Sequence, residues 1–295
     1  MHKVLLALFC FISVSALAQK TIFIDEAIRP MSKDSQSSFM VEIPQAKLAE
    51  TQKDWLKYIS TGSKGKATVV NGENLQPAAV VKNISANPVN IYSKLLETTD
   101  GVRLTAWFTE NDTVFMSAQL NGDQDLAIQK YLRDFAVKKY QDAVKAELAV
   151  QQEILNGMNK DLKDLIKEEE KSGKKVSESN RAIQKSNDNI ATNNADIQAA
   201  SYKISDQKGM VERTAADKNA QKGAKQTLKD LENNKKKLQK ANESENKNID
   251  AMNKAIREEE RKIAEAKDKV TAKTAQIEQQ KQNVADTQKK LDGIK

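Results

Sequence analysis

The chain of 295 residues has a single cysteine and a single histidine, and both occur within its first ten residues, as Cys10 and His2. If that segment is removed, the mature chain can form no disulfide and offers no thiol nucleophile, Ser-His-Asp triad or His/Cys metal site. We therefore expect no catalytic residues, no metal site and no cofactor, and a fold that is stabilised by packing alone.

Residues 1–18 have the pattern of a secretory signal peptide. A short basic start precedes an apolar run at residues 4–15, and residues 16–18 read Ala-Leu-Ala, a small-x-small cleavage pattern. The apolar run is short for a membrane anchor, and Phe9 is too large to precede a lipidated Cys10. We expect cleavage after residue 18, a periplasmic or extracellular location, and no transmembrane segment in the mature chain.

Aromatic residues are also scarce, at 5% of the chain, and only Tyr202 follows Tyr140. Because aromatic side chains supply much of the buried area of a globular core, the core must precede about residue 140. We expect an α+β domain at residues 19–150 and a helical arm at residues 151–295.

The first part of this domain has the pattern of a small, mostly antiparallel sheet with one or two packed helices. Between two early strands, residues 30–38 form a serine-rich segment that suggests a loop. The predicted strands are residues 21–25, 39–43, 67–70, 78–84, 89–96, 102–109 and 114–118, and the predicted helix is residues 45–60.

Alternation in the strand at residues 102–109 predicts which side chains share a face of the sheet. Leu104 and Phe108 fall on one face, whereas Arg103 and Trp107 fall on the other, which we expect to be solvated. A tryptophan on that second face either packs under a loop or helix or marks a ligand site, and packing is the more common case.

A longer helix is expected from Asp123, which is suited to cap its first turn. Its first four turns close the globular domain and then continue as the arm. They hold a broad apolar stripe that needs a sheet to pack on, made of Leu126, Ile128, Tyr131, Leu132, Phe135 and Tyr140.

The arm has the seven-residue apolar repeat of a coiled coil. One series of a positions runs from Leu148 to Val211 and a second from Leu228 to Leu291, and many d positions are small or polar. The phase breaks between the two series, which predicts an antiparallel hairpin with its turn near residues 222–224 and a length of roughly 100 Å.

This turn would place Ile190 opposite Ile256 and Ile197 opposite Ile249, give or take half a layer. The competing turn site is residues 171–175, which would give shorter helices folded into a bundle. The heptad phase passes through that site undisturbed, so we prefer the long hairpin.

Motifs that suggest chemistry have simpler explanations. Residues 61–66 lack the first glycine and the final Ser/Thr of a phosphate-binding loop and follow a helix, so we interpret them as a turn. The acidic runs at residues 168–170 and 258–260 point in different directions on a helix and favour a solvated face. The lysines at 235–237 are the best nucleic-acid candidate.

Charge is unevenly divided between the two parts. Residues 19–122 have 11 basic and 11 acidic side chains, and the rest of the mature chain has 36 and 30. This excess of six positive charges is spread along a long hairpin without interleaved aromatic residues. It therefore predicts weak contact with anionic envelope polymers or lipid surfaces and no specific nucleic-acid binding.

Two classes of function fit these features. The first is an exported, non-enzymatic scaffold or adaptor, typical of a bacterial cell envelope, which binds unidentified proteins through the domain and the arm. The second is a small-ligand-binding or enzymatic α+β domain on a stalk. We favour the first, because catalysis would need carboxylates, Lys, Ser or Tyr alone, and none of these cluster in the sequence. The oligomeric state is left open by the heptads.

Overall fold

The structure is a computed structural model that describes residues 21–295. The predicted signal peptide at residues 1–18 therefore lies outside the described residues. Contacts divide the chain into two compact units. The first contains the chain up to Leu155 together with Gln279–Lys295, and the second is Asn156–Glu278. The first unit thus includes Gln279–Lys295, whereas the predicted division at residue 150 places these residues in the arm.

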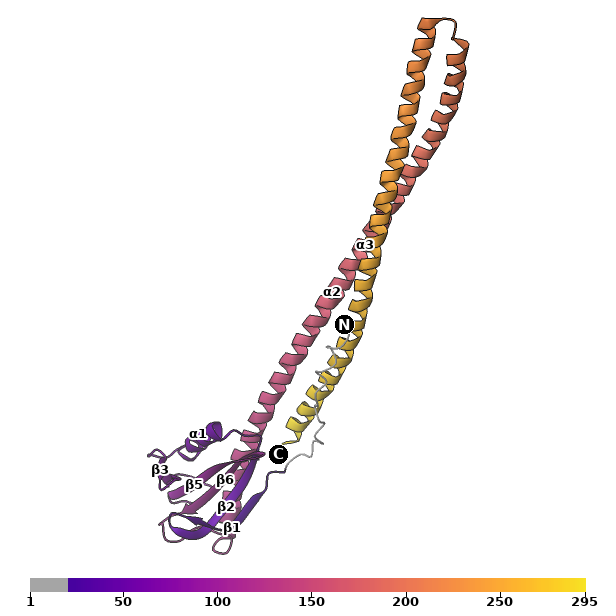
Figure 1. The fold of residues 1–295 in the computed structure, drawn as a ribbon. Helices are drawn as coiled ribbons and strands as arrows, with labels where there is room; N and C mark the ends of the chain where they lie inside the picture. The colour runs from indigo at the N-terminus through magenta and orange to yellow at the C-terminus, as the bar shows by residue number, and fades with distance from the viewer. Residues whose placement is uncertain (1–20) are drawn as a thin grey trace. The chain divides into compact units, whose positions relative to one another are not determined.

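A six-stranded antiparallel sheet forms the centre of the first unit, with strand order β1-β2-β6-β5-β4-β3 (Figure 1). Every pair of neighbouring strands is antiparallel, as the sequence predicted. The strands are β1 (Ile24–Met31), β2 (Asp34–Pro44), β3 (Thr68–Val70), β4 (Glu73–Ala79), β5 (Val89–Thr98) and β6 (Gly101–Thr109).

Helix α1 (Leu48–Ile59) and the first turns of α2 (Gly122–Arg213) pack on one face of this sheet. Trp55 of α1 is fully buried, lies 4.9 Å between ring centroids from Phe135, and donates its indole N–H to Ser93 Oγ at 2.8 Å. An indole buried in this way adds apolar area and satisfies its single donor. Trp55 therefore joins α1, α2 and β5 in one core.

The predicted alternation in β6 is confirmed. Leu104 and Phe108 are completely buried in the core under the helices, whereas Arg103 on the second face is exposed. The second face is solvated only in part, because Trp107 is just 1% exposed.

The predicted loop at residues 30–38 is wrong, because most of it belongs to the hairpin of β1 and β2. Only Ser32 and Lys33 form the turn between these strands. The serines are used between the strands: Ser38 Oγ donates to the Ala27 carbonyl oxygen at 2.8 Å, and Arg29 donates to Ser38 Oγ at 2.9 Å. Serine richness therefore reflects cross-strand hydrogen bonding here and not a loop.

Two other predicted strands differ from the structure. The strand predicted at residues 78–84 is mostly wrong, because β4 is Glu73–Ala79 and residues 82–84 form a turn. The register of β4 is irregular between Gln76 and Ala79, where Pro77 has no N–H to donate. Residues 114–118 form only a single bridge, because local hydrogen bonds to the Asn111 side chain from the Thr113 and Val114 amides compete with strand pairing.

The start of α2 also differs in detail. Asn121 Oδ1, and not Asp123, accepts the amide hydrogens of the first turn, from Asp123 at 3.1 Å and Gln124 at 3.3 Å. Ile128 of the predicted stripe is buried as expected, but Leu126 is 64% exposed. Leu126 is two residues from Ile128, so it lies on the opposite side of the helix from the sheet.

The second unit is an antiparallel helical hairpin formed by the distal part of α2 and most of α3 (Lys218–Gly293). The turn is at residues 214–217, so the predicted turn at 222–224 is wrong, and the competing site at 171–175 lies inside α2. Asp217 Oδ1 caps α3 by accepting the amide hydrogens of Asn219 at 2.9 Å and Ala220 at 3.2 Å. Gly223, in the middle of the predicted turn, is helical.

The predicted heptad positions are confirmed as the seam between the helices, because the a and d residues of α2 and α3 in this unit are buried or half-buried. The register differs from the prediction. Asn193 donates to Asn242 Oδ1 at 2.9 Å, and Asn189 donates to Glu245 at 2.9 Å. Ile190 therefore lies beside Glu245 and not opposite Ile256, and the predicted pairing of Ile197 with Ile249 fails for the same reason.

In the first unit, the end of α3 packs beside α2 and the sheet. Ile294 is 5% exposed within the core, and its carbonyl oxygen accepts a hydrogen bond from Gln141 at 3.1 Å. Lys290 donates to the Gln45 side chain at 2.8 Å and pairs with Glu147 at 3.4 Å. Within residues 21–295, none of the helices has a stretch apolar enough and long enough to span a membrane.

Candidate functional site

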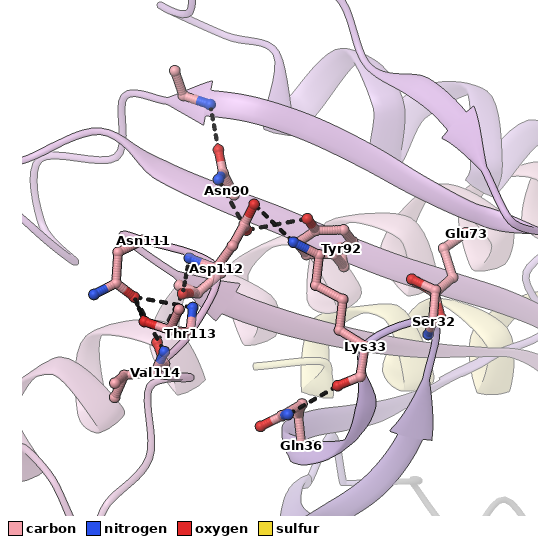
Figure 2. A network of polar contacts seen from close by, with 12 residues as sticks. Ser32, Lys33, Gln36, Glu73, Asn90, Tyr92, Asn111, Asp112, Thr113 and Val114 are labelled. Carbon is pink, nitrogen blue, oxygen red and sulfur yellow. Dashed lines mark hydrogen bonds and ion pairs between the residues drawn. The ribbon is translucent and has the colours of Figure 1, made fainter.

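The second face of the sheet holds a compact group of polar side chains that we call the second-face network: Ser32, Lys33, Glu73, Tyr92, Lys94 and Asp112. Glu73 on β4 is completely buried. Its carboxylate accepts the Ser32 amide at 2.9 Å and the Ser32 hydroxyl at 2.6 Å, and Lys94 Nζ lies 3.0 Å from Oε1. Figure 2 shows Ser32, in the β1–β2 turn, beside Glu73.

The second half of the network surrounds Asp112. Its carboxylate pairs with Lys33 Nζ at 2.8 Å and accepts hydrogen bonds from Asn90 at 3.0 Å and from the Tyr92 hydroxyl at 3.1 Å (Figure 2). Burial alone would raise the pKa of Asp112, but the hydrogen bonds from Lys33, Asn90 and Tyr92 together lower it. The hydrogen bond to Asp112 likewise raises the pKa of Lys33.

A small apolar cluster of Tyr92, Trp107 and Phe115 lies under this network. Trp107 is 1% exposed, and Lys94 Nζ lies 5.9 Å from the centroid of its ring. Phe115 lies in the segment after β6, so Trp107 is covered by that segment. This is the packing interpretation of Trp107 that the sequence favoured.

The charges of the second-face network neutralise one another. Glu73 pairs with Lys94, and Asp112 pairs with Lys33. The hydrogen bonds that lower the pKa of Asp112 stabilise it as an anion, which makes it a poor proton acceptor. The contacts of Ser32 with Glu73 and of Lys33 with Asp112 hold the β1–β2 turn against the second face of the sheet. Sequence alternation could place Lys94 and Trp107 on this face, but no local signal showed that Ser32 folds back onto Glu73, 41 residues away.

A second polar group lies in the seam of the hairpin unit. Ser172 and Lys175 of α2 and Glu259 and Lys262 of α3 line a shallow cleft of about 240 Å³. Glu259 pairs with Lys262 at 2.9 Å and with Lys175 at 3.2 Å. Hydrogen bonds from Lys262, then Ser172 and Lys175, lower the pKa of Glu259 to about 2.

The lowered pKa of Glu259 predicts acid sensitivity of the hairpin. Because the folded state holds the anion, the contribution of Glu259 to stability is complete above its ordinary pKa of 4.5 and is lost as the pH falls toward about 2. We expect the thermal midpoint, followed by helical circular dichroism, to fall less between pH 5 and pH 2 in Glu259→Gln than in the wild type. Equal losses in the two proteins would contradict this role.

The motifs that could have suggested chemistry have structural roles. Residues 61–66 are the turn between α1 and β3, as predicted. In the acidic runs, Glu169 lies 3.9 Å from Lys267 Nζ, and Glu259 is paired as described. Among residues 21–295, no group of three or more His, Cys, Asp or Glu side chains is placed to hold a metal ion. Lys235 is half-buried in the seam, whereas Lys236 and Lys237 are exposed.

The chain matches no protein-family model and no curated protein sequence. A function for it therefore has to come from its own residues and their arrangement.

Proposed function

We propose that the protein is an exported, non-enzymatic scaffold or adaptor of a bacterial cell envelope. It binds one partner through the first unit, which we call the sheet unit, and another through the helical hairpin of the second unit. The observation that carries this proposal is a pair of long helices, of 92 and 76 residues. One face of each helix packs against the other helix, and the remaining faces are exposed. Long paired helices present outward surface at little cost in core material, which suits partner binding.

Two features of the polar groups support a scaffold over an enzyme. The ionised side chains form ion pairs within the second-face network and within the Glu259 cleft. These charges therefore stabilise the fold. The hairpin seam includes polar layers such as Asn193 with Asn242. Buried polar residues in a coiled coil fix register at a cost in stability, a trade that favours a surface of defined geometry.

Export is tested by the mass of the protein recovered from a bacterial host. We expect the exported protein to begin at Gln19, because the Ala-Leu-Ala pattern ends at Ala18. Recovery in the cytoplasm with residues 1–18 intact would contradict the proposed location.

Partner binding is tested in the full chain by site-specific photo-crosslinking in envelope preparations. Probes replace Leu96 on the sheet unit, which is 57% exposed, and Tyr202 on the hairpin, which is 70% exposed. We expect each probe to capture its own protein partner, in amounts that an excess of unlabelled protein reduces. A matched probe at buried Trp55 should capture none. Identical background at all three positions would count against an adaptor.

A further inference from the structure

Six lysines form one stripe on the outer side of α3 next to the turn. They are Lys218, Lys222, Lys225, Lys229, Lys236 and Lys240, and all six are exposed. Their spacings of three, four and seven residues place them on one face of the helix. At 1.5 Å per residue, the stripe is about 33 Å long. We call it the lysine stripe.

None of the stripe lysines forms an ion pair within the described part of the chain. Within residues 21–295, no carboxylate lies within 4.0 Å of the amino group of any stripe lysine. The stripe positives are therefore available to an external anion.

The net charge of the arm is confined to this region. Residues 201–241, which we call the loop end, have 11 basic and 5 acidic side chains, whereas residues 123–200 and 242–295 together have 25 of each. The sequence-based expectation of an excess spread along the hairpin is wrong. A concentrated patch gives a much stronger local field than the same charge distributed over the whole arm.

A cluster of exposed lysines on one face of a helix favours binding to the surface of an anionic bilayer. Lysine is a hydrated point charge on a flexible stem, which suits a diffuse layer of headgroups better than one fixed anion.

We propose that the loop end of the hairpin docks on a lipid bilayer that contains anionic phospholipids. The lysine stripe attracts the headgroups. A bilayer is favoured over a nucleic acid because a single exposed tyrosine offers no series of rings for base stacking. The inference rests on the proposed function only in taking the hairpin as a binding element, and it can be tested with purified components.

The test measures binding of the full chain to vesicles by flotation at about 100 mM salt. One set of vesicles contains phosphatidylcholine alone and the other includes about one third phosphatidylglycerol. We expect binding to the anionic vesicles only. A lysine near an anionic surface contributes about fivefold in affinity, so Lys222→Gln, Lys225→Gln and Lys229→Gln combined should lower it about 100-fold.

A matched triple variant removes the same charge elsewhere. Lys160, Lys163 and Lys185 are exposed on α2 outside the loop end, and replacing all three by Gln should change affinity less than about threefold. Helical circular dichroism checks that both triple variants are folded. Equal losses in the two triple variants, or no binding to anionic vesicles, would overturn the proposal.

A competition separates a bilayer from a soluble polyanion. When long-chain polyphosphate is added at the same phosphate concentration as the anionic vesicles, most of the protein should stay bound to the vesicles. If polyphosphate binds more tightly than the vesicles, the site is for anionic polymers and the bilayer proposal fails. Because no envelope protein is present, neither result depends on the partners of the proposed adaptor.

Discussion

Gly101→Ala is expected to destabilise the sheet unit by about 4 kcal/mol or more. A Cβ atom at this position would lie 2.1 Å from the carbonyl oxygen of Ile43 and 2.8 Å from the amide nitrogen of Gln45. Both are backbone atoms of the end of β2 and the residue after it, so no side chain can move aside. Strands β2 and β6 would have to separate at the β5–β6 turn, where Gln45 N–H donates to the Asp100 carbonyl at 2.7 Å.

Urea unfolding followed by tryptophan fluorescence measures this effect, because both tryptophans, Trp55 and Trp107, lie in the sheet unit. Gly72→Ala is the matched control: Gly72 has a left-handed φ of 78°, but no atom lies within 4 Å of the added Cβ. It should cost only about 1 kcal/mol, from backbone conformation alone. Similar costs at the two glycines would show that the close approach at Gly101 is not structurally important.

Glu73→Ala should destabilise the same unit by about 3 kcal/mol. The substitution removes a fully buried carboxylate and leaves the Ser32 amide and Lys94 without their acceptor. Lys94 is 38% exposed and can regain water, which places the loss at the lower end of the range for broken buried pairs. The β1–β2 turn should also exchange its amide hydrogens faster.

Two variants divide this effect into parts. Glu73→Gln keeps an acceptor for Ser32 but loses the charge. We therefore expect its free energy of unfolding to lie between those of the wild type and Glu73→Ala. Ser32→Ala removes only the 2.6 Å hydroxyl bond and should cost about 1 kcal/mol. If Glu73→Ala is no worse than Ser32→Ala, Glu73 does not join the turn to the sheet.

The elements with strong periodicity were predictable from the sequence. The heptad positions of the arm and the two faces of β6 follow from repeats of seven and two residues that the structure preserves. A repeat reports which face of an element is buried, and this information is local. In the first unit, α1, β5 and β6 were placed within a few residues for the same reason.

Features that depend on contacts between distant residues were not predictable. The break in heptad phase predicts a turn at residues 222–224, but Asp217 caps α3 and Gly223 continues the helix. The change of phase between the two heptad series indicates that the seam is interrupted, but it does not indicate at which residue the chain turns. An error of a few residues in the turn then shifts every predicted pair across the seam.

The second-face network was missed because no spacing in the sequence relates Ser32 to Glu73. The local charge of the loop end was accessible, since it needs only a count over residues 201–241, but counting over the whole arm averaged it away. The lack of ion pairs along the lysine stripe required the structure, because pairing depends on which helix faces which.

The register of the hairpin is the central claim, and paired cysteines test it most directly. In a Cys10→Ser background, Asn193→Cys with Asn242→Cys places two thiols where the native side chains are hydrogen-bonded at 2.9 Å. Ile190→Cys with Ile256→Cys is the comparison, since Ile256 lies 11 residues beyond Glu245, about 16 Å along the helix. Each protein is treated with a short thiol-to-thiol crosslinker at low protein concentration, and its mass and peptide map are measured.

The structure predicts a rapid crosslink within one chain for positions 193 and 242 and little for positions 190 and 256. A preferential crosslink between positions 190 and 256 would instead support a turn near residues 222–224. Crosslinks only between chains would contradict an intramolecular hairpin.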